Sequence, residues 1–339
     1  MSCGSTWFSD SAQKSKMATA VSRTYYIDYV PCLKVYTNKC VNYARYCGEP
    51  KSHKAPKRTD FHKSLSDIAK RKIEKIIDFM SDTAKWHKVW CEAERKHVWF
   101  RLGFLTLTLP ASQLNDFGRS ELAANDEMFL NDELLTVSDV GFRYSDDFIK
   151  SNILNHYLTI LREKYGVHNY LWKAEPQSNG NIHFHIVIDQ FIHWKALQYI
   201  WNRCLSKTTL IDEFEKKFGH RNPPTIKVHA IRNVESIRKY ITKYLAKAEF
   251  EKRKINGRKW SCNEDLSKYD GVTIELRGQL LYDKQILFHL PEHFKFYDKF
   301  FTIYNLSIWQ LATVLEGTRL WQVYVSEFEK KYNFKFQFR

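Results

Sequence analysis

The run Asn181–Ile188 alternates strictly between two sets of positions, and this alternation constrains the fold more than any other stretch of the sequence. A period of two predicts a β-strand with His183 and His185 on one face and Phe184 on the other. Two imidazoles one strand step apart can share a divalent metal ion. The alternative is a pair of histidines that faces solvent or the core without a ligand.

The segment before this strand predicts a hairpin that supplies a carboxylate. Residues 178–180, Ser-Asn-Gly, suit a three-residue loop whose glycine is left-handed. This register pairs Glu175 with His183 and Lys173 with His185, and directly paired residues share one face of a sheet. A two-residue loop would shift the register by one and turn Glu175 away. A surface salt bridge is the alternative role for this glutamate.

The predicted ligands Glu175, His183 and His185 combine nitrogen and oxygen donors and leave coordination positions open. A divalent ion held in this way can polarise a phosphate and stabilise developing charge. Mg²⁺ or Mn²⁺ fits that chemistry, while Zn²⁺ or Ni²⁺ can also bind such ligands tightly. We therefore expect a divalent metal cofactor, Mg²⁺ or Mn²⁺.

Hydrophobic periodicity predicts the elements around this hairpin. In chain order they are a helix over 61–82, a strand over 98–109, a helix over 145–165, strands over 169–175 and 181–189, a helix over 193–206, a strand over 225–231 and a helix over 233–249. From the strand over 98–109 onward the order is β-α-β-β-α-β-α. It predicts an α+β fold, the ferredoxin-like split βαβ arrangement with a central antiparallel sheet. Residues 207–224 are expected to be a polar connection.

The last predicted helix, 233–249, carries two tyrosines among lysines. At about 100° per residue, Tyr240 lies at the edge of the polar face near Lys243 and Lys247, while Tyr244 lies closer to the apolar stripe. Neighbouring ammonium groups favour a phenolate and can hold a phosphodiester. The alternative is a pair of boundary tyrosines beside solvated lysines.

Composition indicates a polyanionic partner. The formal net charge is +15, and 15% of the residues are aromatic. Basic side chains attract phosphates, and aromatic rings can stack on unpaired bases. The odd count of seven cysteines fits a reducing compartment, and no apolar run reaches the length of a membrane span. We expect a cytoplasmic protein with no membrane partner.

Three motifs carry a resemblance to a known family. They are Phe104–Pro110, then Glu175 with His183-Phe184-His185, then Tyr240-x-x-Lys243-Tyr244-x-x-Lys247. Together they resemble the HUH endonuclease superfamily over about residues 100–250, especially the rolling-circle replication initiators of single-stranded DNA phages and small plasmids. The order of the motifs along the chain agrees with that of the family.

This resemblance implies metal-assisted nicking and joining of single-stranded DNA at a replication origin. It implies Tyr240 as the nucleophile of a 5′-phosphotyrosine linkage, with Lys243 as its partner and Lys247 nearby, and a free 3′-hydroxyl that primes synthesis. Tyr244 matches the second, alternating tyrosine of some phage initiators, or it is a packing residue. No nucleotide-binding Gly-x-x-x-x-Gly-Lys-Ser/Thr motif occurs, so we expect a host helicase and polymerase in a bacterial cytoplasm.

The predicted organisation has three parts. Residues 1–60 form a basic, partly flexible arm, 61–255 the HUH endonuclease domain, and 256–339 an aromatic-rich extension that packs on the core. Two alternatives remain open at this point: a relaxase or transposase of the same superfamily, and a ferredoxin-like nucleic-acid binder without catalysis.

Overall fold

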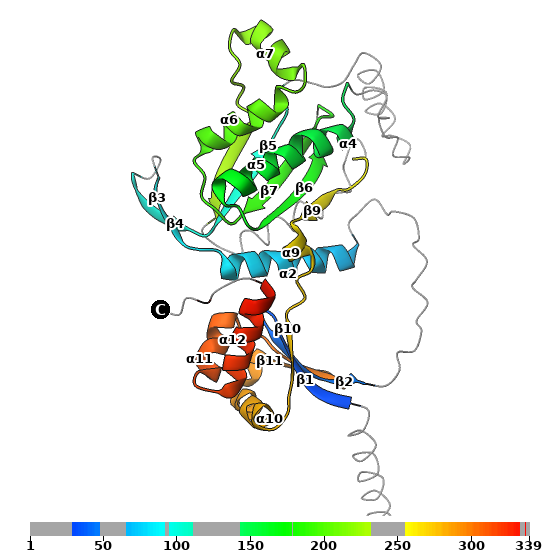
Figure 1. Cartoon of the computed structure of the whole chain (residues 1–339), viewed down its shortest axis with the longest axis vertical. Helices are drawn as coiled ribbons and strands as arrows, with labels where there is room; N and C mark the ends of the chain where they lie inside the picture. The colour runs from blue at the N-terminus through cyan, green and yellow to red at the C-terminus, as the bar shows by residue number, and fades with distance from the viewer. Residues whose placement is uncertain are drawn as a thin grey trace, which may run out of the picture. The chain divides into compact units, whose positions relative to one another are not determined.

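The chain forms two compact units (Figure 1). This computed structural model describes residues 29–47, 66–91, 95–110, 143–177, 179–231, 255–332 and 336. Unit 1 combines residues 1–59 with residues 270–339, and unit 2 is the continuous segment 60–269 between them.

The main sheet of unit 2 has the strand order β8-β5-β7-β6-β9, and all neighbouring strands are antiparallel. The strands are β5 (Leu102–Leu107), β6 (Tyr170–Pro176), β7 (Ile182–Ile188), β8 (Ile226–Ile231) and β9 (Trp260–Cys262). Because β7 lies between β5 and β6, which run parallel to each other, this is the split βαβ arrangement. The predicted α+β fold is confirmed, and so is the central position of the histidine strand.

Helices α5 and α6 cover one face of this sheet (Figure 1). The helices of unit 2 are α2 (Asp67–Thr83), α4 (Asp146–Phe148), the π-helical η3 (Ile149–Leu154), α5 (Asn155–Tyr165), α6 (Trp194–Leu205), α7 (Leu210–Phe218) and α9 (Glu264–Ser267). Phe184 and Ile186 of β7 pack with Leu161 of α5 and Trp201 of α6 in one buried cluster. Each such side chain contributes about 1.5–3 kcal/mol by leaving water.

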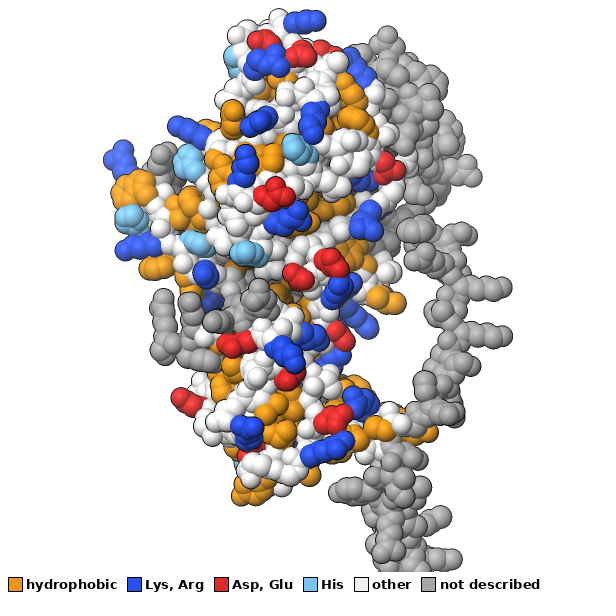
Figure 2. All heavy atoms as spheres, in the orientation of Figure 1, with side chains coloured by type: hydrophobic (Ala, Val, Ile, Leu, Met, Phe, Trp, Pro, Cys, Tyr) orange, Lys and Arg blue, Asp and Glu red, His pale blue; other side chains and the backbone are white. Residues whose placement is uncertain are grey.

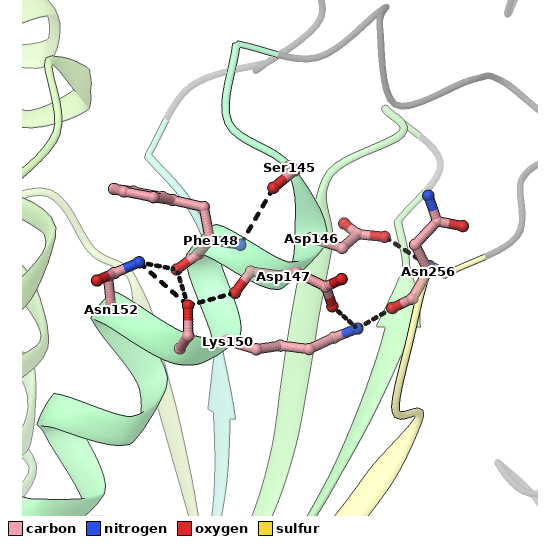
Figure 3. Close-up of polar contacts among 8 residues, drawn as sticks. Ser145, Asp146, Asp147, Phe148, Lys150, Asn152 and Asn256 are labelled. Atoms are coloured by element: carbon pink, nitrogen blue, oxygen red, sulfur yellow. Dashed lines mark hydrogen bonds and ion pairs between the residues drawn. The ribbon is translucent and has the colours of Figure 1, made fainter.

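The helix that begins after Ser145 also fixes the chain that returns to the sheet (Figure 3). Ser145 is the predicted N-cap, and its Oγ accepts a hydrogen bond from the Phe148 N–H at 3.2 Å. The buried Asp146 carboxylate accepts from the Asn256 N–H at 3.0 Å, and the Lys150 ammonium donates to the Asn256 carbonyl. These bonds anchor the segment from which β9 joins the edge of the sheet beside β6.

Two predicted elements of unit 2 differ from the structure. The strand expected over 98–109 breaks at Arg101 into β4 (Lys96–Phe100) and β5, and β4 pairs with β3 (His87–Cys91) in a separate ribbon. The connection expected over 207–224 contains helix α7. Its three apolar residues are buried and Gly219 ends it with a φ of 73°, so a mostly polar sequence still forms a helix.

Unit 1 contains a second antiparallel sheet, of order β10-β1-β2-β12-β11. Its strands are β1 (Tyr29–Val35), β2 (Cys40–Tyr46), β10 (Val272–Glu275), β11 (Lys295–Tyr297) and β12 (Phe301–Tyr304). Its helices are α10 (Gln279–Asp283), the 3₁₀ segments η5 (Lys284–His289) and η6 (Glu292–Phe294), α11 (Ile308–Leu315) and α12 (Arg319–Tyr332). The buried Asp283 carboxylate accepts from the Leu320 N–H at 2.9 Å and so holds the start of α12.

The expectation of a basic arm over 1–60 is wrong for residues 29–46. These residues form β1 and β2, which pair with each other and with β10 and β12. Their partners lie more than 200 residues further along the chain, where no local pattern reveals them. The boundary expected at 255–256 also differs, because β9 and α9 belong to unit 2 and the contact boundary falls between Tyr269 and Asp270.

We expect Asp146→Ala to destabilise unit 2 more than Asp147→Ala does. The Asp146 carboxylate is 3% exposed and binds the Asn256 N–H, so its loss leaves a buried donor unsatisfied and costs about 1–3 kcal/mol. The Asp147 side chain is 72% exposed and lies 3.7 Å from Lys150, a surface pair worth about 0–1 kcal/mol. Urea unfolding of both variants measures the difference, and equal midpoints would contradict the anchoring role of Asp146.

Candidate metal centre

The β6–β7 hairpin has the register that the sequence predicts. Glu175 pairs with His183 and Lys173 pairs with His185. The Gln177 N–H donates to the Asn181 carbonyl at 2.8 Å, and Gly180 next to it has a φ of 80°. A side chain with a Cβ would be strained at this φ, so the glycine permits the turn that sets the register.

Glu175, His183 and His185 bring three potential ligand atoms together on the face of the sheet opposite α5 and α6. The two Nε2 atoms are 3.0 Å apart. Glu175 Oε2 lies 3.3 Å from Nε2 of His185 and 3.6 Å from Nε2 of His183. Their side chains are only 10–14% exposed. The three predicted ligands therefore converge in a nearly buried group.

These distances fit a shared divalent ion. Ligands about 2.1 Å from one metal, at tetrahedral or octahedral angles, lie about 3.0–3.4 Å from one another. Two of the ligand-to-ligand distances in this cluster, 3.0 and 3.3 Å, fall in that range, and the third, 3.6 Å, lies just above it. Glu175, His183 and His185 could thus hold a metal ion with little rearrangement.

Lys173 sets the charge of the glutamate. Its ammonium contacts Glu175 Oε1 at 2.5 Å, which leaves Oε2 directed at the histidines. Burial alone would raise the pKa of Glu175, but hydrogen bonds with His183 and His185 and the charge of Lys173 outweigh it and lower the pKa well below its usual range. The carboxylate is therefore ionised, as a metal ligand must be.

The ring of His185 is fixed by strand β5. Its Nδ1 lies 3.2 Å from Thr106 Oγ1, and Phe104 stacks on it with centroids 5.5 Å apart and planes at 16°. When Nδ1 carries the proton and donates to Thr106, Nε2 keeps its lone pair for a metal. Burial lowers the pKa of His185, and the nearby Glu175 opposes this shift without reversing it, which favours the neutral ring.

Sequence reasoning missed the individual roles of Thr106 and Lys173. Both lie in the row that crosses the sheet through His185, since Thr106 and Lys173 pair with it from either side. The Lys173 pairing follows from the hairpin register. The Thr106 pairing depends on which strand neighbours β7, and that information is not local.

The predicted nucleophile residues Tyr240, Lys243, Tyr244 and Lys247 lie outside the described residues. The strand that leads to them, β8, pairs with β5 on the side away from β7. Lys227 of this strand pairs with Thr106 and is exposed, so one basic side chain belongs to the same row as His185.

Comparison with known proteins gives one family match. Residues 135–249, about a third of the chain, match the model of the replication-associated protein ORF2 family. The match is consistent with a replication initiator and includes the hairpin of the candidate metal centre. No curated protein and no solved structure gives a significant match.

Among the helices that the structure describes, none combines the length and the apolar character needed to span a membrane.

We expect Mn²⁺ to stabilise the wild-type protein through this cluster. A ligand at about 100 times its Kd adds about 2.7 kcal/mol to the free energy of unfolding. Glu175→Gln and His183→Ala each remove one converging atom and should abolish most of that gain. Thermal unfolding with and without Mn²⁺ measures it.

The matched control for this experiment is His156→Ala, which removes an exposed histidine of α5 on the other face of the sheet. It should keep the full Mn²⁺ effect. An equal Mn²⁺ effect in all variants would contradict binding at the hairpin cluster.

Proposed function

We propose that this protein is a metal-dependent endonuclease that nicks and rejoins single-stranded DNA through a tyrosine and so initiates rolling-circle replication. The observation that carries the proposal is the convergence of Glu175, His183 and His185 on one face of the central sheet. The match to a replication-associated family supports the same class and favours replication over mobilisation.

In the proposed reaction the Tyr240 hydroxyl oxygen attacks a backbone phosphorus. The phenol proton is lost to solvent, the new O–P bond forms, and the bond from phosphorus to the 3′-oxygen breaks. The 3′-oxygen takes up a proton and leaves as a free hydroxyl, while the 5′-phosphate stays on the tyrosine. The reverse attack, by a 3′-hydroxyl on this phosphotyrosine, rejoins the strand and releases the tyrosine.

The remaining residues have binding and positioning roles in this proposal. A bound Mg²⁺ or Mn²⁺ would supply Lewis-acid polarisation of the scissile phosphate. Lys243 and Lys247 lower the cost of the phenolate and hold the phosphodiester. The exposed Lys227, in the same row as His185, offers a further cation to the DNA backbone.

The proposed biological setting follows from that chemistry. The free 3′-hydroxyl primes a host polymerase, and a host helicase unwinds the duplex from the nick at the origin. A bacterial cytoplasm, with a phage or plasmid as the replicated DNA, is the proposed location. The nicking domain is assigned to residues 61–255, nearly all of unit 2.

Tyr240→Phe should eliminate the covalent adduct with DNA. The variant lacks only the attacking oxygen, so single-stranded DNA binding should persist. Labelled single-stranded origin DNA with Mn²⁺ measures the adduct as a slow-migrating band, and mass spectrometry of the trapped peptide identifies the residue. A full-strength adduct in Tyr240→Phe would contradict the assignment, and salt-sensitive binding without an adduct in the wild type would favour a non-catalytic binder.

Tyr244→Phe separates the one-tyrosine scheme from the alternating one. If the two tyrosines alternate, the variant should nick once and fail to join or to start a second round. Single-turnover and multiple-turnover assays on the same origin strand distinguish the two activities. Wild-type behaviour in both assays would make Tyr244 a packing residue.

A further inference from the structure

The β3–β4 ribbon of unit 2 has two very different faces. Toward the protein it presents Val98 and Phe100, which are 9% and 2% exposed, and Phe100 meets Phe191 edge-on with centroids 5.3 Å apart. The opposite face carries Trp90 and Trp99, which are 54% and 51% exposed. A two-stranded ribbon therefore has its small apolar residues buried and its indoles in water.

Three successive rungs of the outer face share one composition. Lys88 pairs with Trp99 and Trp90 pairs with His97 in the antiparallel register. One rung further, the Arg101 guanidinium lies 4.4 Å from the ring centre of Trp86, which is 45% exposed. Each rung thus combines one indole with one lysine, arginine or histidine.

The geometry of this face suits unpaired bases. Diagonal neighbours across two antiparallel strands have Cα atoms about 7–8 Å apart, so Trp90 and Trp99 form one compact surface. The Trp90 ring is held edge-on by His97, with centroids 5.3 Å apart. Rings that are already ordered lose little freedom when a base stacks on them, and base–aromatic stacking tolerates any sequence.

The charge of the ribbon matches a phosphate backbone. Within 85–91 and 95–101, the described residues include Lys85, Lys88, Arg95, Lys96 and Arg101 and no acidic residue, while Glu92 and Glu94 lie in the turn outside the described residues. Figure 2 shows hydrophobic, basic and histidine side chains together where this ribbon projects in Figure 1. Aromatic rings interleaved with cations are the usual surface for single strands.

We propose that the outer face of the β3–β4 ribbon, formed by Trp86, Lys88, Trp90, His97, Trp99 and Arg101, is a second binding surface for single-stranded DNA. The ribbon continues directly into β5, whose Leu102 is about 13 Å from Thr106 beside the metal cluster. A strand bound here is thus tethered a few nucleotides from the site of cutting. The choice of DNA rests on the proposed function, whereas the stacking surface needs no metal.

The test uses the full-length protein in EDTA and a fluorescein-labelled 30-nucleotide mixed-sequence strand, with affinity measured by fluorescence anisotropy. Trp90→Ala/Trp99→Ala should raise Kd by about tenfold or more, because stacking on each ring is lost. Trp194→Ala is the matched control, since Trp194 of α6 is 47% exposed and also lies near a lysine, with Lys195 Nζ 5.7 Å from its ring centre. The control should leave Kd unchanged.

Two further variants separate stacking from charge and from misfolding. Trp90→Phe/Trp99→Phe keeps flat rings and should retain most of the affinity. Lys88→Gln should reduce the slope of log Kd against log salt by about 0.7, the value for one phosphate contact on a single strand. The double alanine variant should bind the matching duplex as the wild type does.

Several results would overturn the proposal. One is an equal Kd for the double alanine variant, the Trp194→Ala control and the wild type. Another is a phenylalanine pair that binds as weakly as the alanine pair, or an equal loss of affinity for duplex and single strand. Concentration-dependent self-association that disappears in the double alanine variant would assign the surface to a protein contact.

The outcome is independent of the nicking proposal. A protein that passes this test in EDTA but forms no adduct with Mn²⁺ would keep the binding surface and lose the nickase. A protein that forms the adduct while its ribbon variants bind normally would do the reverse.

Discussion

The pairing of β6 with β7 in one register is the constraint on which the core and the candidate site both depend. In this register Trp172 and Ala174 face the helices with Phe184 and Ile186, while Glu175 faces the other side with the histidines. A slip by one residue would exchange the two faces. Glu175 would then enter an apolar cluster without a partner, at a cost of several kcal/mol. The apolar core therefore selects the same register that assembles the ligands.

Local pattern was sufficient for the central part of the fold. The loop length, the glycine at its end and the alternation of β7 predicted the hairpin and the convergence of Glu175 with His183 and His185, and the structure confirms both. The Ser145 cap and the order of strands and helices from β5 to β8 were also predictable, because these elements are long and periodic. Boundaries shifted by only a few residues.

What the sequence could not provide was information about distant partners. The strands at 29–46 depend on β10 and β12 for their pairing, and the break at Arg101 depends on β3. The contact of Thr106 with His185 requires β5 to lie next to β7, which is a property of the assembled sheet. The helix α7 was missed because only three apolar residues mark it. Long-range topology, rather than residue type, accounts for most of the differences.

The division of unit 1 between both ends of the chain has a consequence for its synthesis. Strands β1 and β2 leave the ribosome first, but their outer neighbours β10 and β12 follow more than 200 residues later. At about 5–20 residues per second this delay is about 10–50 s. During it the early hairpin presents two open hydrogen-bonding edges to the crowded cell. The inserted unit has time to finish folding first, so a nascent chain needs protection at its leading end rather than in its middle.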